Sequence, residues 1–192
     1  LLDTATISAR RTADWFLADG AEGFRNPDCG LGSLAILLSE THDGKRADYA
    51  GGPVPRATFA ATKKAVRSWL TRVETHRDNL AIIYVASHGE SFQSHTAFLL
   101  EDYGTDTRDA TAGMANVEQF ITSMNNAVPI RQLMIFDCCR RPTGEALPWD
   151  ETLGDKLITL TKGGPNDHGL PRKQWIICST TLGEVALGRK RL

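Results

Sequence analysis

The chain has 192 residues and a formal net charge of -1, because 22 Lys and Arg side chains stand against 23 Asp and Glu. Such a balance gives no field for nucleic acid or for an acidic membrane surface, so we expect neither as a partner. No apolar run is long enough to cross a bilayer, and no secretory segment opens the sequence. With 41% hydrophobic residues, the composition predicts a single globular α/β domain over residues 1–192.

The four cysteines form no spaced framework of the kind that disulfides or zinc sites require; they are residues 29, 138, 139 and 178. Cys138 and Cys139 are adjacent, so in an extended chain their side chains point to opposite sides and suit a single metal ion poorly. We therefore expect reduced thiols, a cytoplasmic location, no metal and no cofactor.

Helical and strand-like segments alternate along the first half of the chain. We predict a helix over Ile7–Leu17, a short strand over Leu34–Leu38, a loop over residues 42–55 and an amphipathic helix from Phe59 to Val73. Leu80–Ala86 is the clearest strand, since it is apolar on both faces as a central parallel strand should be.

The second half continues the alternation. Ala97–Leu100 predicts a weaker strand, and residues 117–124 predict a helix for which Asn116 is a suitable N-cap. Two further buried strands are expected at Leu133–Phe136 and Trp175–Cys178.

The stretch between these two strands is the least regular part of the sequence. Residues 141–171 hold four prolines and a Gly163-Gly164 pair, which predict a long loop with a helix near Leu153–Leu160. The order of strands and helices as a whole predicts a mostly parallel sheet that helices cover on both faces.

Reactive side chains follow two of the buried strands. His88 comes directly after Leu80–Ala86, and Cys138 and Cys139 come after Leu133–Phe136. Functional groups of open α/β sheets gather at the carboxyl ends of the strands, and neighbouring strands lie about 5 Å apart. A cysteine at a strand end is more often a buried hydrophobe, and a lone histidine a surface residue. Together, an imidazole and a thiol at adjacent strand tips favour nucleophilic catalysis.

The motifs around these residues resemble those of the caspase and metacaspase clan of cysteine peptidases. Ser87-His88-Gly89-Glu90 is similar to the clan's histidine motif, and Asp137-Cys138-Cys139 to the metacaspase nucleophile motif. The spacing 139 − 88 = 51 agrees with the separation of about 50 residues in caspases. Residues 175–184 resemble the strand and loop that follow the nucleophile. The resemblance covers residues 7–184 and implies a caspase-like α/β/α sandwich, similar to prokaryotic homologues.

The resemblance also implies a catalytic dyad. His88 would be the general base and Cys139 the nucleophile, with the backbone amides of Gly89 and Cys139 holding the oxyanion. Strand alternation agrees with this choice of cysteine, because Asp137 and Cys139 share one face of an extended segment while Cys138 takes the other.

Substrate recognition is implied for three more residues. Asp137 would line the S1 pocket and select Arg or Lys at P1, although a strand-end aspartate that caps nearby amides is the alternative. Ser179 and Thr180 would bind substrate. The implied partners are a protein or peptide substrate and an activating domain or partner protein.

The sequence departs from the clan's pattern in several places. Arg140-Arg141-Pro142 follows Cys139 where metacaspases usually have His-Ser-Gly. The first strand, which we expect before Ile7, is missing, and the second acidic S1 residue has only Asp3 and Ser8 as nearby candidates. Some metacaspases need calcium, and the candidate ligands here are three acids of one loop: Asp102, Asp106 and Asp109. A solvated acidic loop is the simpler interpretation of these residues.

Two other classes of protein remain open from the sequence. One is a catalytically silent caspase-like module that binds partners. The presence of both dyad residues argues against it. The other is an unrelated doubly wound α/β domain that binds a nucleotide or a small ligand. That domain should carry a Gly-rich turn after its first strand, and neither G-x-G-x-x-G nor a P-loop occurs here.

Overall fold

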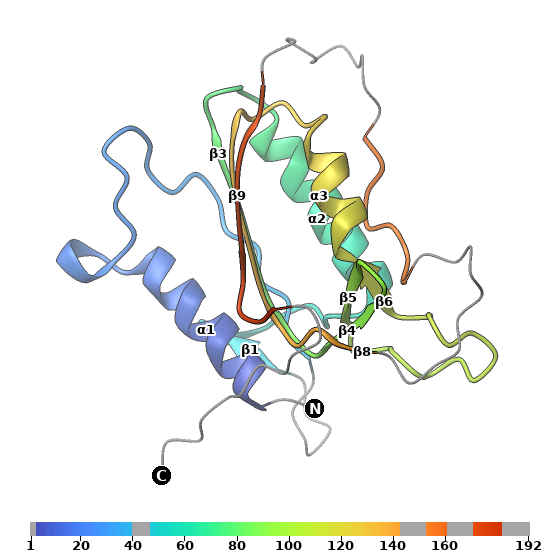
Figure 1. Cartoon of the computed structure of the whole chain (residues 1–192). Coiled ribbons are helices and arrows are strands. Elements are labelled where there is room, and N and C mark those ends of the chain that lie inside the picture. Colours follow the sequence, from blue (N-terminus) through green and yellow to red (C-terminus); the bar gives the residue numbers. More distant parts are fainter. Residues whose placement is uncertain (1–2, 40–46, 143–152, 161–170, 182–192) are drawn as a thin grey trace.

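The computed structural model describes residues 3–39, 47–142, 153–160 and 171–181 (Figure 1). In chain order the elements are α1 (Asp3–Leu17), the short 3-10 helix η1 (Gly20–Glu22), β1 (Asp48–Tyr49), β2 (Gly52–Pro53), α2 (Phe59–Val73), β3 (Leu80–Ser87), β4 (Gly89–Phe92), β5 (His95–Leu99), β6 (Met114–Asn116), α3 (Val117–Met124), β7 (Arg131–Cys138), β8 (Arg141–Pro142) and β9 (Lys173–Cys178).

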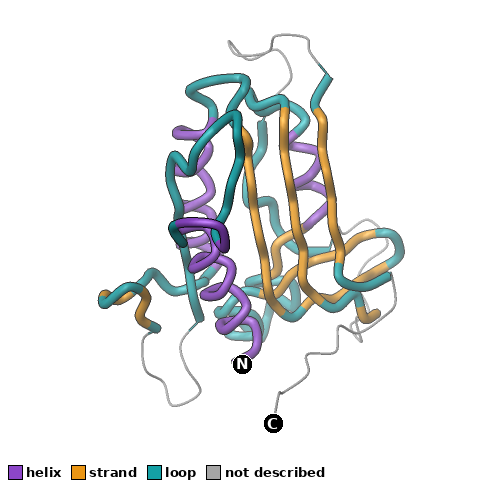
Figure 2. The backbone as a smooth tube through the Cα atoms, turned by 90° about the vertical axis from the view of Figure 1, so that its left-hand side faces the viewer, coloured by secondary structure: helices purple, strands orange, loops and turns teal. Residues whose placement is uncertain are grey.

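The main sheet is parallel and has the strand order β3-β7-β9. Its register runs from Leu80 opposite Arg131 to Ser87 opposite Cys138, and on the other side of β7 from Arg131 opposite Lys173. Helix α1 lies on one face of this sheet, and α2 and α3 lie together on the other (Figures 1 and 2). The expected α/β/α sandwich with a parallel sheet is confirmed.

Burial alternates along β7, the central strand. Gln132, Met134, Phe136 and Cys138 are buried, whereas the residues between them are partly exposed. The buried side of the sheet packs against the apolar faces of α2 and α3, forming a core that includes Val66, Leu70, Val117, Phe120 and Met124. The side-chain positions at the end of β7 are therefore set by this core.

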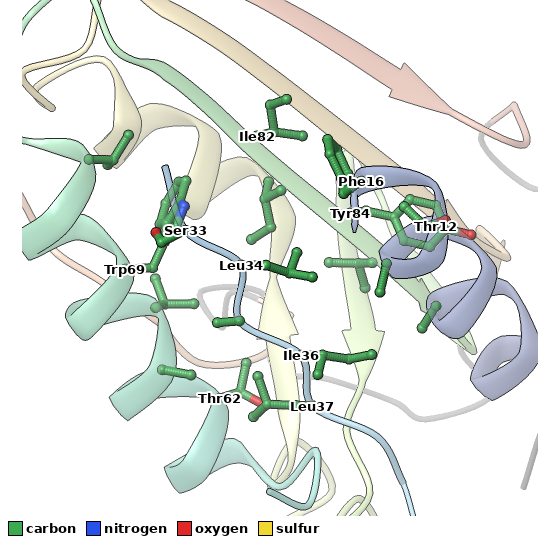
Figure 3. Close-up of a pocket in the computed structure, with 18 of the residues that line it drawn as sticks. Thr12, Phe16, Ser33, Leu34, Ile36, Leu37, Thr62, Trp69, Ile82 and Tyr84 are labelled. Carbon is green, nitrogen blue, oxygen red and sulfur yellow. The ribbon is translucent and has the colours of Figure 1, made fainter. Parts of the chain in front are cut away.

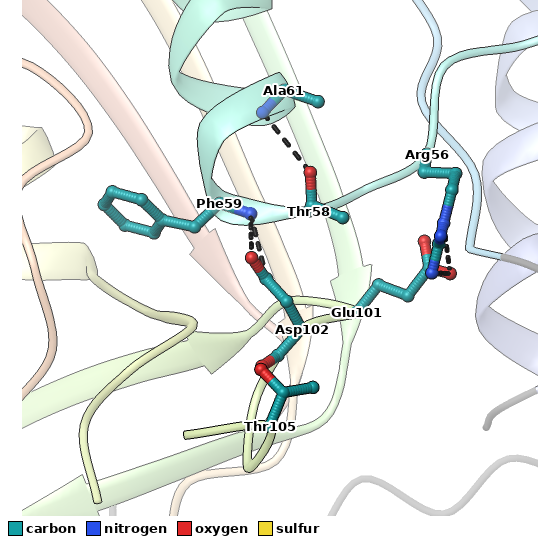
Figure 4. Close-up of polar contacts among 7 residues, drawn as sticks. All are labelled: Arg56, Thr58, Phe59, Ala61, Glu101, Asp102 and Thr105. Atoms are coloured by element: carbon teal, nitrogen blue, oxygen red, sulfur yellow. Dashed lines mark hydrogen bonds and ion pairs between the residues drawn. The ribbon is translucent and has the colours of Figure 1, made fainter. Parts of the chain in front are cut away.

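The two helices of that layer begin where the sequence predicts. The side chain of Asn116 caps α3 by accepting a hydrogen bond of 2.7 Å from the amide of Gln119. Thr58 caps α2 by accepting from the amide of Ala61, and the carboxylate of Asp102 accepts the amide of Phe59 at 2.9 and 3.1 Å (Figure 4). The loop after β5 is thus fastened to the start of α2.

The segment expected as a strand over Leu34–Leu38 is extended but pairs with no strand, so that prediction is wrong. The segment is tied elsewhere: the amide of Leu38 donates to the carbonyl of Pro55, and Ser33 Oγ accepts from Arg72 of α2. Strand β3 therefore lies at an edge of the described sheet, although its apolar sequence predicts a central strand.

A cavity of about 560 Å³ separates this segment from β3. In Figure 3 the segment runs between α2 and β3, with Leu34 and Ile36 on the side of β3 and Leu37 on the side of Thr62 in α2. The open edge explains why the apolar side chains of β3 from Ile82 to Ala86 are half-buried and not buried.

Two more features differ from the sequence predictions. A second sheet of order β6-β5-β4-β8 adjoins the first, and its strand β4 was not predicted because Gly89–Phe92 has only one apolar residue. Residues 153–160 form no helix. Side chains distant in sequence bond to both ends of this stretch: Asn116 donates to the carbonyl of Leu153 at 2.7 Å and Asn126 to that of Leu160 at 2.8 Å. Among the described residues, no helix has the length and apolar character needed to span a membrane.

Candidate active site

His88 and Cys139 lie next to each other at the carboxyl end of the parallel sheet. The last paired residues of β3 and β7 are Ser87 and Cys138, so His88 and Cys139 are the next residues of two adjacent, parallel chains. Side chains at such positions are about 5 Å apart at their backbones. His88 is exposed and Cys139 is half-buried, so both side chains can meet a ligand from solvent.

The backbones at this point are in unusually close contact. A Cβ atom on Gly89 would lie 2.2 Å from the carbonyl oxygen of Cys139 and 3.1 Å from Cβ of Cys138. No side chain fits in that space, so the residue after His88 must be glycine for the two chains to approach this closely. The amide of Gly89 is thereby fixed beside the backbone of Cys139.

The two adjacent thiols differ in their surroundings. The side chain of Cys138 is 2% exposed and packs in the core beside Phe136, as strand alternation predicts. Burial, followed by the neighbouring thiols of Cys178 and Cys139, raises the pKa of Cys138 to about 12. Cys138 is therefore protonated at neutral pH, and the half-buried Cys139 is the thiol of the pair that solvent can reach.

Asp137 faces the same side of the sheet as α1. The hydroxyl of Tyr84 donates a hydrogen bond to Asp137 Oδ2, and Ser8 and Thr12 of α1 lie beside the same phenol. Burial, and then the charge of Asp137, raise the pKa of Tyr84. Ser8, a candidate for the acidic S1 partner position, is thus joined to Asp137 through Tyr84, while Asp3 is the first residue of α1.

Ser179 and Thr180 follow the end of β9 and lie against the backbone of the nucleophile motif. Thr180 Oγ1 donates to the carbonyl of Cys138 at 3.2 Å, and Ser179 Oγ donates to the same oxygen at 3.5 Å. The two residues expected to bind substrate are thus close to Cys139, with their hydroxyl protons given to the protein backbone.

Two residues that sequence reasoning missed hold the chain just after Cys139. Ser91 Oγ donates to the carbonyl of Arg140 at 2.6 Å, and Arg140 Nε donates to Thr96 Oγ1 at 3.2 Å. Ser91 and Thr96 are 4% and 2% exposed. Their signal in the sequence is only a polar residue in a short strand, which is too common to single out.

The acidic loop does not gather into a metal site. Asp102 accepts from the amide of Phe59, Asp106 from that of Arg108, and Asp109 from the amide and hydroxyl of Thr111. The hydrogen bonds from Thr111 lower the pKa of Asp109. Among the residues that the structure describes, no three His, Cys, Asp or Glu side chains come together as metal ligands.

An α/β/α sandwich with a thiol and an imidazole at the ends of two neighbouring parallel strands is the arrangement of a caspase-like fold. The Caspase domain family model matches residues 45–190, and the chain belongs to this family. It is also similar to a protein of Sinorhizobium fredii (strain NBRC 101917 / NGR234) named "Uncharacterized protein y4kE", with 24% identity over 186 residues. The alignment covers 91% of this chain and 52% of the relative, so the chain spans about half the relative's length. No solved structure matches the chain.

Proposed function

We propose that the chain is a cysteine endopeptidase domain that hydrolyses peptide bonds with His88 as general base and Cys139 as nucleophile. The register that pairs Ser87 with Cys138 carries this proposal, because it sets the two reactive residues side by side. Membership of the Caspase domain family supports it. The half-exposed position of Cys139, beside a neighbour whose thiol stays protonated, supports the choice of nucleophile.

The reaction would proceed through an acyl-enzyme. His88 takes the proton of the Cys139 thiol, and the thiolate attacks the carbonyl carbon of the P1 residue. The amides of Gly89 and Cys139 stabilise the oxyanion of the tetrahedral intermediate. Collapse breaks the peptide bond, and the imidazolium gives its proton to the departing amine. A water molecule, deprotonated by His88, then releases the acyl group from Cys139.

Asp137 supports a preference for Arg or Lys at P1. Its carboxylate lies two residues before the nucleophile and on the same face of the strand, where it could pair with a guanidinium or an ammonium group. The proposed substrate is a protein or peptide chain, and an activating domain or partner protein is part of the same proposal. A reduced thiol is required, in keeping with a cytoplasmic location.

Cleavage of a positional-scanning fluorogenic peptide library tests the proposal. We expect activity in the wild type and in Cys138→Ala, and its loss in Cys139→Ala and His88→Ala. A preference for Arg or Lys at P1 that is lost in Asp137→Asn would support the S1 role. Activity after apolar or acidic residues would refute that role and leave the peptidase. A folded wild type that cleaves nothing, with and without calcium, would favour a silent caspase-like module.

A further inference from the structure

At the end of β7, two side-chain hydroxyl groups donate to a carbonyl that a strand amide would otherwise bond. The amide of Ser179 donates to the carbonyl of Phe136 at 3.2 Å, so this carbonyl points from β7 toward β9. The next carbonyl on the same side, that of Cys138, meets no amide of β9 because that strand ends at Cys178. It accepts instead from Thr180 Oγ1 at 3.2 Å and from Ser179 Oγ at 3.5 Å.

This contact also sets the direction of the amide of Cys139. The carbonyl of Cys138 and the N–H of Cys139 belong to one planar peptide unit, and the described residues contain no cis peptide bond. In a trans unit the N–H points opposite to the C=O. Since the carbonyl is held toward β9, the Cys139 N–H is directed toward the side of β7 on which β3 lies, where His88 and Gly89 follow.

We propose that Thr180 and Ser179 are positioning residues that orient an oxyanion donor, the backbone amide of Cys139. This inference rests on the proposed peptidase function. By holding the carbonyl of Cys138 they orient the Cys139 amide toward the carbonyl group under attack. This differs from the direct contact with substrate that the sequence predicts for the pair. A hydroxyl has a single proton to donate, and each of these is given to Cys138.

The proposal predicts a loss confined to steps that develop an oxyanion. Removing an oxyanion donor outright lowers kcat by about 10²–10³-fold. Misdirecting one should cost less, so we expect Thr180→Val to lower kcat about tenfold and Thr180→Val with Ser179→Ala to lower it further. KM should change little, because the ground-state carbonyl makes only weak contacts with the donors.

The experiment compares two reactions of the same thiol. Inhibition by a peptide aldehyde of the preferred sequence forms a hemithioacetal, whose oxygen occupies the oxyanion position. Alkylation of Cys139 by iodoacetamide displaces iodide and forms no oxyanion. We expect Thr180→Val to weaken aldehyde binding about tenfold and to leave the alkylation rate unchanged, while Thr180→Ser, which keeps the hydroxyl, retains both.

Thr71→Val is the matched control, because the Thr71 hydroxyl also donates to a carbonyl, that of Arg67, but on the exposed surface of α2. A fall in aldehyde affinity and alkylation alike would show that Thr180 maintains the site generally and would overturn the inference. A higher KM with unchanged kcat would instead assign Thr180 to substrate binding. If the wild type neither hydrolyses peptides nor binds aldehydes, the proposed function fails and the inference with it.

Discussion

The hydroxyl of Tyr84 in β3 lies 3.3 Å from Oδ2 of Asp137 in β7 and donates a hydrogen bond to it. This contact brings the central strand of the sheet close to α1, since Ser8 and Thr12 lie beside the same phenol. It also occupies one oxygen of the carboxylate that we propose for P1 recognition. The orientation of Asp137 therefore depends on a residue 53 positions away in sequence.

The raised pKa of Tyr84 predicts how stability changes in alkaline solution. An unfolded tyrosine ionises near pH 10, whereas folded Tyr84 keeps its proton to higher pH. Unfolding then releases a proton, so the stability present below pH 10 is lost as the pH rises through the folded-state pKa. We expect urea unfolding to show a steeper loss between pH 9 and 11 in the wild type than in Tyr84→Phe. Burial and the hydrogen bond to Asp14 also raise the pKa of Tyr49, so Tyr49→Phe should reduce the slope as well, and the double variant should reduce it further. Equal pH slopes for wild type and Tyr84→Phe would contradict the prediction.

The two adjacent cysteines should differ in their reaction with alkylating agents. Burial raises the pKa of Cys138 to about 12, so its thiol stays protonated at pH 8, and its side chain is closed off from solvent. We expect mass spectrometry after iodoacetamide treatment to find label on Cys139 and on exposed Cys178, and on Cys138 only after unfolding in urea. Labelling of folded Cys138 at the rate of Cys178 would refute this difference.

The close approach at Gly89 makes any larger residue costly. In Gly89→Ala the new methyl group would meet the carbonyl of Cys139 at 2.2 Å, so the two chains must move apart. We expect a loss of about 3 kcal/mol in the free energy of unfolding and no detectable peptidase activity. Gly32→Ala is the control, since no atom lies within 4 Å of its added Cβ. Chemical denaturation of both variants measures the difference, and a stable Gly89→Ala would show that the chains are not packed this closely.

The carboxylate of Asp102 should contribute to stability as a cap of α2. It accepts the amide of Phe59 and places negative charge at the positive end of the helix (Figure 4). We expect Asp102→Ala to lower the free energy of unfolding by about 1–2 kcal/mol. Asp106→Ala, in an exposed turn of the same loop, should change it by about 0.5 kcal/mol or less. Equal effects of the two substitutions would show that the contact with α2 contributes nothing.

Sequence reasoning succeeded where a residue's pattern is local. Apolar periodicity located α2, α3, β3, β7 and β9, and side-chain alternation placed Cys138 in the core. The sequence predicts that His88 and Cys139 follow two adjacent strand ends, and the parallel register pairs the residues just before them, Ser87 and Cys138.

Predictions failed where long-range contacts decide the structure. The extended segment at Leu34–Leu38 has the composition of a strand, but hydrogen bonds to Pro55 and Arg72 hold it away from β3. Residues 153–160 contain the apolar side chains of a helix, and side-chain amides of Asn116 and Asn126 bond to their carbonyls instead. None of these four partners is near in sequence to the segment that it holds, so the local pattern could not reveal them.

Both reactive residues lie where the chain crosses from one sheet to the other. β3 continues through His88 into β4, and β7 continues through Cys139 and Arg140 into β8, with Glu90 opposite Arg141. The proposed dyad therefore lies at the junction of two sheets that are hydrogen-bonded separately. A substitution at Ser91, whose hydroxyl donates to the carbonyl of Arg140, would alter the separation of imidazole and thiol without removing an apolar side chain from the main core. The proposed peptidase activity should thus be lost at a lower temperature than the fold.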